Sequence, residues 1–291
     1  MTKPDGLQAI EKPLASLPAT IRNLILEHFR ALTKYEPVIG IMGKTGAGKS
    51  SLCNSLFAGN VTPVSDVTAC TREALYFRLY NGNHSLVLVD LPGVGESEIR
   101  DEKYKALYRN ILPELDLIIW VIKADDRALA VDENFYRHVL GNSFQNKVLF
   151  VINQADKTEP CHEWNSANNQ PSPQQIANLA LKFHDITRLL QPINPICAIS
   201  VKTNWNITEM VELMVESLPD KSTSPLSAQL HSHLRSERVK ETARNDFGNA
   251  AGGILDVVAS LPVVSRPVKS LIHQIRDAVV SIARCVWDFF F

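Results

Sequence analysis

The chain has 291 residues with a formal net charge of −1, and this balance excludes a broad electrostatic attraction to nucleic acid. Hydrophobic residues make up 45% and charged residues 21%, which excludes a largely disordered chain. The five cysteines are scattered and never form a C-x-x-C pair, so we expect neither a disulfide framework nor a zinc site. The first residues lack an apolar signal core, and no stretch is long enough for a conventional spanning helix. We therefore expect a cytoplasmic protein.

Residues 1–36 are predicted to form a helical N-terminal extension. Ser16 and Pro18 have the character of a helix cap and first turn, and apolar residues then recur at helical spacing up to Leu32. This amphipathic pattern favours a helix docked on the domain that follows. An arm that binds a partner is the alternative, and the sequence leaves it open.

A glycine-rich stretch between a predicted strand and a predicted helix carries the strongest signal in the chain. An apolar run at residues 38–41 leads into the turn, and apolar residues at helical spacing follow it. Between them lies G-x-x-x-x-G-K-S, from Gly43 to Ser50. A loop that wraps phosphates must point several backbone N–H groups inward, which requires φ values that only glycine adopts at low cost. The helix that begins near Lys49 adds the positive end of its dipole.

We predict that this loop, the P-loop, binds the phosphates of a nucleotide. Lys49 is expected to reach the β- and γ-phosphates, and the Ser50 hydroxyl is the expected Mg²⁺ ligand. An ordinary glycine-rich turn is the alternative. The presence of the strand, the full motif and the helix together disfavours it. The residues predicted to contact the nucleotide here are Gly43, Thr45, Gly46, Ala47, Gly48, Lys49, Ser50 and Ser51.

From residue 38 onward, strand and helix patterns alternate, which is typical of a doubly wound α/β sheet that is mixed but mostly parallel. Residues 60–73 are rich in Thr, Ser and Asp and are predicted to be a loop, followed by an edge strand at 74–79. Asn206 and Glu209 resemble a capping box that opens a late helix. The remaining predicted strands are 86–89, 115–121, 148–151 and 196–199.

Polar side chains follow three of these strands, at the point where each strand ends. Asp90 to Gly93 come after one strand, Asn153 to Asp156 after a second, and Ser200 to Lys202 after a third. Ligands of an open parallel sheet bind at this carboxyl edge. Each short motif alone would be an ordinary turn, but together with the P-loop they resemble, in order, the five signature motifs of the translation-factor-type GTPases. The resemblance covers about residues 37–219.

This resemblance implies a guanine nucleotide, GTP or GDP, with Mg²⁺. A carboxylate at Asp156 can accept hydrogen bonds from the guanine N1–H and N2 amino groups, whereas adenine lacks that pair of donors. Thr71 matches the switch threonine that closes on Mg²⁺, Asp90 a second residue on the Mg²⁺ side, and Gly93 the sensor of the γ-phosphate. The residues that match the guanine-binding loops are Asn153, Asp156, Ser200, Val201 and Lys202.

Three positions depart from the common pattern of these GTPases. Gln154 stands where most relatives have lysine, which shortens the aliphatic stem over the base and predicts a modest nucleotide affinity. Val94 replaces the water-orienting glutamine of Ras-type enzymes, as in the Era, TrmE and septin groups. Gly46 stands where many Era and TrmE relatives have an asparagine that helps to bind an activating potassium ion, so potassium activation is not expected. Arg72, beside Thr71, is a candidate arginine finger or an ordinary surface charge.

The P-loop sequence, the Cys-Thr-Arg segment at residues 70–72 and the chain length resemble one subgroup in particular. It comprises the Era-like GTPases of enterobacterial prophage regions, the YfjP/YkfA/YeeP type. Nothing after residue 219 supplies the G-x-x-G loop of an RNA-binding KH domain, so we do not expect a direct KH-type contact with nucleic acid.

Residues 220–291 are predicted to form a helical C-terminal extension beyond the GTPase domain of 37–219. Apolar residues recur at helical spacing from Val268 to Val286, before an aromatic end. We favour a helical hairpin packed on the GTPase domain or on a second subunit. The alternative is a membrane-surface anchor, which small residues, aromatic residues and flanking arginines would serve, although Asp256 opposes simple insertion.

Two classes of function follow for this predicted GTPase. The first is a nucleotide-dependent switch with slow intrinsic turnover, whose GTP state is read by a protein or other partner. The second is a self-assembling GTPase of septin or dynamin-like habit at a membrane surface, in which a neighbouring subunit completes the site. A P-loop ATPase is a third reading, which hydrolysis of GTP but not of ATP would remove.

Overall fold

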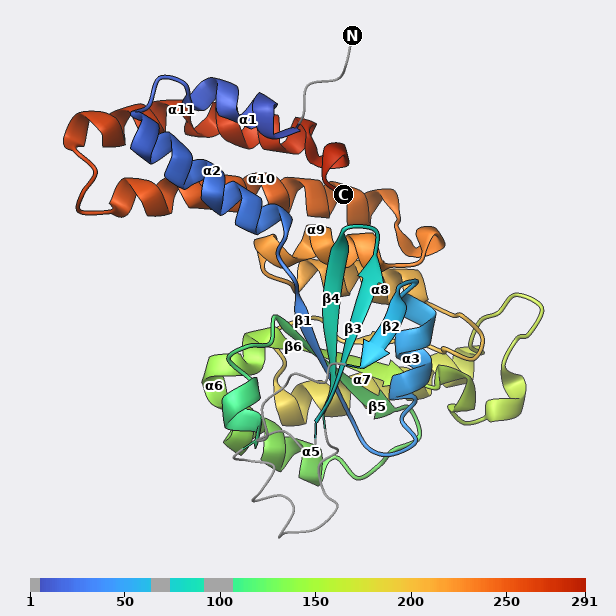
Figure 1. Ribbon diagram of the computed structural model, residues 1–291. Helices are drawn as coiled ribbons and strands as arrows, with labels where there is room; N and C mark the ends of the chain where they lie inside the picture. The colour runs from blue at the N-terminus through green and yellow to red at the C-terminus, as the bar shows by residue number, and fades with distance from the viewer. Residues whose placement is uncertain (1–5, 64–73, 92–106) are drawn as a thin grey trace. The chain divides into compact units, whose positions relative to one another are not determined.

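Figure 1 shows the computed structural model, which describes residues 6–63, 74–91 and 107–291. The chain divides into two compact units. The helical unit comprises Met1–Glu36, Pro219–Ala228 and Glu237–Phe291, and the sheet unit comprises Pro37–Leu218 and Gln229–Ser236. The two terminal extensions, which the sequence suggested as separate parts, therefore belong to one unit, except that Gln229–Ser236 belongs to the sheet unit.

The sheet unit is built on a sheet of seven strands among the described residues, in the order β2-β3-β4-β1-β5-β6-β7. The central strand β1 pairs in parallel with β4 and β5, and the parallel pairing continues through β6 to β7. The pairs β2–β3 and β3–β4 are antiparallel, which confirms the predicted mixed, mostly parallel sheet. The strands are β1 (Val38–Met42), β2 (Asn60–Pro63), β3 (Leu75–Asn81), β4 (His84–Asp90), β5 (Leu117–Lys123), β6 (Val148–Asn153) and β7 (Cys197–Ala198).

The edge of the sheet differs from the prediction. The segment predicted to be a loop begins with β2, which pairs with β3 and forms the edge, so β3 is an inner strand. Thr, Asn and Pro suggest a loop by composition, but at an edge strand one row of backbone groups needs no partner, so such residues are tolerated there.

The core of the sheet unit lies around β5 and β6, whose side chains are almost all buried. Trp120 of β5 stands at its centre and contacts the rings of Phe135, Tyr136 and Phe150. Strands buried on both faces produce continuous apolar runs, which is why the sequence predicts them well. The α-helices of this unit are α3 (Lys49–Leu56), α5 (Ala130–Phe135), α6 (Gly141–Phe144), α7 (Pro173–Leu190) and α8 (Ile207–Glu216), and a π-helix spans Tyr136–Leu140.

The capping box lies at a different helix from the predicted one. Ser172 caps α7, because its hydroxyl accepts from the Gln175 N–H while the Gln175 side chain accepts from the Ser172 N–H. Asn206 precedes α8 in a left-handed conformation without a side-chain cap, and its amide instead donates to the Ala198 carbonyl. Asn206 therefore ties α8 to the edge strand β7.

The helical unit brings both ends of the chain together, and Figure 1 shows the blue N-terminal helices beside the red C-terminal ones. Its core includes Phe29 from one end and Phe247, Leu255, Ile272 and Val279 from the other, all buried. The apolar stripe of the C-terminal segment is therefore buried within this unit. The helices are α1 (Gly6–Leu14), α2 (Ala19–Thr33), α9 (Asp220–Gln229), α10 (Glu237–Ser260) and α11 (Arg266–Cys285). No helix in the described part of the chain has the length and apolar character to cross a membrane.

Candidate functional site

The P-loop follows β1, at the point where the strand order reverses between β4 and β5. Gly43, Gly46 and Gly48 have φ values of 143°, 77° and 91°, which side chains rarely tolerate. Space is also limiting at two of these positions. A β-carbon on Gly43 would lie 2.2 Å from the Val121 carbonyl oxygen, and one on Gly48 would lie 2.4 Å from Nδ2 of Asn153. The structure therefore requires the two outer glycines for close approach as well as for conformation.

The loop ends in α3, which begins at Lys49 directly after the left-handed Gly48. Lys49 Nζ donates to the carbonyl oxygen of Gly43 at 2.9 Å and so spans the loop. Lys49, Ser50 and Asp90 also line one cavity of about 300 Å³. Thr45, Gly46, Ser50 and Ser51 are exposed, whereas Ala47 is buried.

Asp90, at the end of β4, is the carboxylate of this cavity. Burial raises its pKa above the ordinary value, and the nearby Lys49 opposes the shift. Its Oδ1 atom is buried and has no hydrogen-bond partner among the described residues. A buried carboxylate oxygen without a partner, in a cavity shared with a serine hydroxyl, fits Mg²⁺ held through few protein ligands plus water and phosphate. The described residues contain no cluster of three His, Cys, Asp or Glu side chains that would hold a metal alone.

Asn153, at the end of β6, connects three segments of the site. Its Nδ2 donates to the Ala47 carbonyl of the P-loop at 2.8 Å. Its Oδ1 accepts from the N–H groups of Gln154, at 2.7 Å, and Val201, at 3.4 Å. Two of these three hydrogen bonds therefore hold the β6 end to loops that lie far from it in the sequence.

Asp156 lies in the same region and is 9% exposed. The Ser200 hydroxyl donates to its Oδ1 at 2.7 Å, and Lys202 Nζ lies 3.9 Å from its Oδ2. Ser200 is fully buried, while the Lys202 side chain is mostly exposed. The structure therefore brings together the two motifs that the sequence predicted to read the base, with the Asp156 carboxylate held in a fixed orientation.

Gln154 has a role that the sequence analysis did not foresee. It adopts a left-handed conformation, with φ of 64°, and its Nε2 donates to the Gly46 carbonyl at 2.8 Å. Its Oε1 accepts from Lys157 Nζ at 3.0 Å. The Gln154 side chain therefore reaches the P-loop although it is shorter than lysine.

Lys44, inside the P-loop, was also missed. Its ammonium lies 2.8 Å from Oδ2 of Asp126 and 2.8 Å from Oδ2 of Asp132, and it donates to the Ala128 carbonyl. Burial alone would lower the pKa of Lys44, but the hydrogen bonds of the two carboxylates hold it above the ordinary value. Lysine at a variable motif position carries no signal by itself, and nothing in the sequence pairs it with carboxylates 82 and 88 residues away.

Some predicted site residues lie outside the described residues. These are Thr71 and Gly93, together with Arg72 and Val94.

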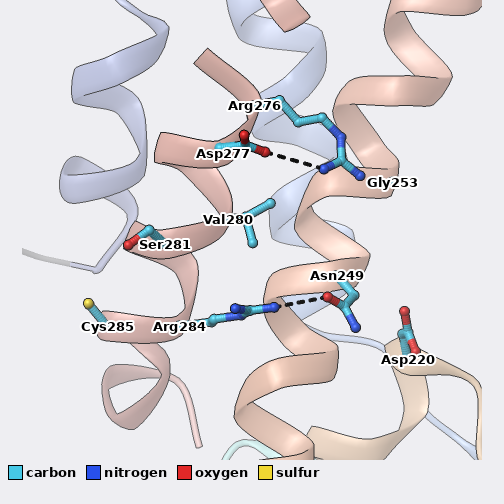
Figure 2. Close-up of a pocket in the computed structure, with 9 residues that line it drawn as sticks. All are labelled: Asp220, Asn249, Gly253, Arg276, Asp277, Val280, Ser281, Arg284 and Cys285. Carbon is cyan, nitrogen blue, oxygen red and sulfur yellow. Dashed lines mark hydrogen bonds and ion pairs between the residues drawn. The ribbon is translucent and has the colours of Figure 1, made fainter. Parts of the chain in front are cut away.

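The helical unit contains a separate groove of about 800 Å³ between α10 and α11 (Figure 2). Arg284 donates to Oδ1 of Asn249 at 3.1 Å, and Arg276 forms a two-pronged ion pair with Asp256. A β-carbon on Gly252 would lie 3.0 Å from Nη2 of Arg276. The small residues of α10 therefore make room for arginine side chains of α11. Packing between the two helices thus explains why these residues are small.

Comparisons with known proteins agree with the geometry of the sheet unit. A family described as 50S ribosome-binding GTPase matches residues 38–154. The Escherichia coli (strain K12) protein YkfA is 51% identical over 291 residues, which cover 100% of both chains, and YfjP of the same organism is 53% identical over 285 residues, 98% of both chains. GTPase Der of Acinetobacter baumannii (strain AB0057) is 33% identical over 122 residues, 42% of this chain and 26% of that protein.

The resemblance stated from the motifs is thereby confirmed, because full-length relatives and a GTPase family converge on the segment that holds the P-loop. The nucleotide of such a protein is GTP, which the residues around Lys49 and Asp156 fit. The chain belongs to the family of Era-like P-loop GTPases that includes YkfA and YfjP, and it is a GTP hydrolase.

Proposed function

We propose that this GTPase acts as a nucleotide-dependent switch whose isolated subunit hydrolyses GTP slowly. The proposal is carried by the buried Asp156 carboxylate, which Ser200 orients beside a P-loop already bound to the same strand end by Asn153. A site with this preorganisation binds a guanine nucleotide in one orientation, and its state can be read by a partner.

Each part of the site has a proposed role. The loop from Gly43 to Ser51 surrounds the phosphates, with Lys49 on the β- and γ-phosphates. Ser50 and Asp90 hold Mg²⁺, with Thr71 as the further ligand that the resemblance implies. Mg²⁺ would neutralise charge on the phosphates. Gly93 is proposed to sense the γ-phosphate through its N–H, also from the resemblance.

Asp156 is proposed to select guanine. Its two oxygens can accept from the N1–H and N2 amino groups, and adenine would leave this desolvated carboxylate without partners. The resulting preference is on the order of 1–3 kcal/mol or more. Asn153, Ser200, Val201 and Lys202 keep the carboxylate and the surrounding loop in place, which the hydrogen bonds of Asn153 and Ser200 support.

Slow turnover is proposed because Val94 replaces the glutamine that orients the attacking water in Ras-type enzymes. Unaided hydrolysis on the order of 10⁻⁴–10⁻² s⁻¹ is the expected scale. The test is the rate of phosphate release per subunit, measured over a hundredfold range of protein concentration. Lys49→Ala, which removes the ammonium proposed to contact the phosphates, is the inactive reference. Lys240→Ala in the helical unit is the control.

A constant slow rate per subunit, specific to GTP over ATP, supports the switch. A rate that rises with concentration overturns it in favour of the self-assembling alternative, in which a neighbouring subunit supplies a missing group. Fast turnover by dilute protein, unaffected by Arg72→Ala, contradicts both the slow rate and the need for a partner.

A further inference from the structure

Lys44 differs from the other lysine of the P-loop, Lys49, because it is held by carboxylates instead of by the loop itself. Its two partners come from the segment after β5: Asp126 lies in the loop and Asp132 in α5. Asp132 is 2% exposed, and its second oxygen accepts from Nε1 of Trp120 at 3.2 Å. Trp120 in turn is fully buried in the centre of the sheet unit. The ammonium is thus attached, through Asp132 and Trp120, to the buried centre of the core.

The Asp126 side of this attachment is also fixed. The Ala128 N–H donates to Oδ1 of Asp126 at 2.9 Å, and Lys182 of α7 donates to the Asp126 carbonyl oxygen. Burial alone would raise the pKa of Asp126, but the bonds from Lys44 and Ala128 hold it below its ordinary value. Both carboxylates are therefore paired with the Lys44 ammonium and are themselves held by further hydrogen bonds.

The P-loop is also held by two residues at the end of β6. Asn153, at the end of β6, and Gln154, which follows it, donate to the carbonyls of Ala47 and Gly46 in the middle of the loop. Lys44 attaches the beginning of the loop, one residue after Gly43, to the segment after β5. A loop that must present several N–H groups to phosphate at once loses less entropy on binding when both halves are already fixed.

We propose that Lys44 is a positioning residue, which fixes the first half of the P-loop to Asp126 and Asp132 and thereby sets the affinity for the nucleotide. The inference rests on the proposed binding of guanine nucleotide by this loop. Lys44 is already engaged by two carboxylates and a carbonyl, so it acts through the loop and does not serve as a free cation for phosphate.

The test is a double-mutant cycle on the full chain, read as the dissociation constant of fluorescent GDP. Lys44→Met and Asp132→Asn are made singly and together, and the asparagine keeps an oxygen for Trp120. Each single change is expected to weaken GDP binding by about tenfold, and the double change by about the same factor instead of the product. Lys44→Arg, which can still reach both carboxylates, should restore near-normal binding, whereas a role in packing alone would not show this rescue. Lys240→Met, which breaks an exposed ion pair of α10, is the control.

Three outcomes overturn the inference while the wild type binds GDP: unchanged affinity in Lys44→Met, effects of the single changes that multiply, or unchanged affinity in Asp132→Asn. The last outcome would mean that the contact between Lys44 and Asp132 does not set the affinity. If Lys44→Met fails to fold because Asp132 is left unpaired, the double variant, which removes both charges, decides instead. Wild-type affinity in that variant also overturns the inference. A wild type that does not bind GDP contradicts the proposed function itself.

Discussion

Asn153 Nδ2 donates to the carbonyl oxygen of Ala47 at 2.8 Å, which joins the end of β6 to a loop 106 residues earlier. The same nitrogen lies 2.4 Å from the position that a β-carbon on Gly48 would occupy. The Asn153 amide can fix the loop because Gly48, which has no side chain, leaves space for it. The P-loop and the segment after β7 are thus both held by the Asn153 side chain.

Gly48→Ala should abolish GTP binding, because the methyl group would displace Asn153 as well as strain the backbone. Gly82→Ala is the matched control, since Gly82 also has a positive φ, of 61°, but has no atom within 4 Å of the added carbon. Strain alone should cost the control about 1–2 kcal/mol of stability and leave GTP affinity unchanged. Titration with fluorescent GTP measures the affinity of both variants. Equal losses of affinity in the two variants would show that strain, and not contact with Asn153, is responsible.

Exchanging sodium for potassium should change the rate of GTP hydrolysis little. A β-carbon on Gly46 would lie 3.3 Å from Nζ of Lys123, so an ammonium already occupies the space beside this position. At equal ionic strength the two salts screen alike, so the rates should agree within about twofold. Phosphate release in KCl and NaCl at the same concentration is the measurement. A rate several times higher in KCl would indicate a potassium site and contradict this expectation.

The sequence predicts the sheet best where burial is most complete. β5 and β6 are continuous apolar runs because both faces of these strands are covered, and local composition is then sufficient. The edge strand β2 was missed because its pairing with β3, and not its own residues, makes it a strand. The shared helical unit was missed for a related reason, since nothing local shows that α1 and α2 pack with α10 and α11.

The candidate site divides in the same way. The P-loop and the motifs at Asn153 and Ser200 were predicted because each is a short pattern that follows a strand. Lys44 and Gln154 were not assigned their contacts, because both reach carboxylates or carbonyls on segments distant in the chain. Such pairs depend on tertiary contacts that a single sequence does not reveal.

The stability of the protein should depend on pH through Asp246 of α10. Burial raises the pKa of this carboxyl to about 6, Asp220 adds to the shift, and a hydrogen bond with Thr223 opposes it. Between about pH 4 and pH 6 the folded protein therefore keeps a proton that the unfolded chain has released. The free energy of unfolding should fall as the pH rises through this window and remain lower above it.

Asp246→Asn tests this directly, because asparagine cannot ionise. The variant should be more stable than the wild type above pH 6 and similar to it near pH 4, as measured by denaturant unfolding at each pH. Asp277→Asn, whose carboxylate is 96% exposed on α11, is the control and should keep the wild-type profile. If the stability of Asp246→Asn varied with pH in parallel with that of the wild type, Asp246 would be excluded as the source of the pH dependence.

The helical unit should lose stability when a side chain of its buried apolar stripe is shortened. Ile272 of α11 is fully buried, so Ile272→Ala should cost about 3 kcal/mol of unfolding free energy through lost contacts and a cavity. Val263 is 85% exposed, and Val263→Ala should cost no more than about 0.5 kcal/mol. Helical circular dichroism during denaturation measures both. Equal small effects, together with salt-sensitive sedimentation of the wild type with anionic liposomes, would favour the membrane anchor.

The most direct test of the guanine site is the base preference of Asp156→Asn. Xanthine has a carbonyl at C2 where guanine has an amino group, so it needs a donor where guanine needs an acceptor. The asparagine amide supplies that donor, and GTP affinity should fall by at least about tenfold while XTP binding appears. Asp185→Asn, an exposed carboxylate of α7, is the control and should still prefer GTP. The account predicts a reversal of preference to XTP in competition titrations, and an Asp156→Asn variant that still prefers GTP would contradict it.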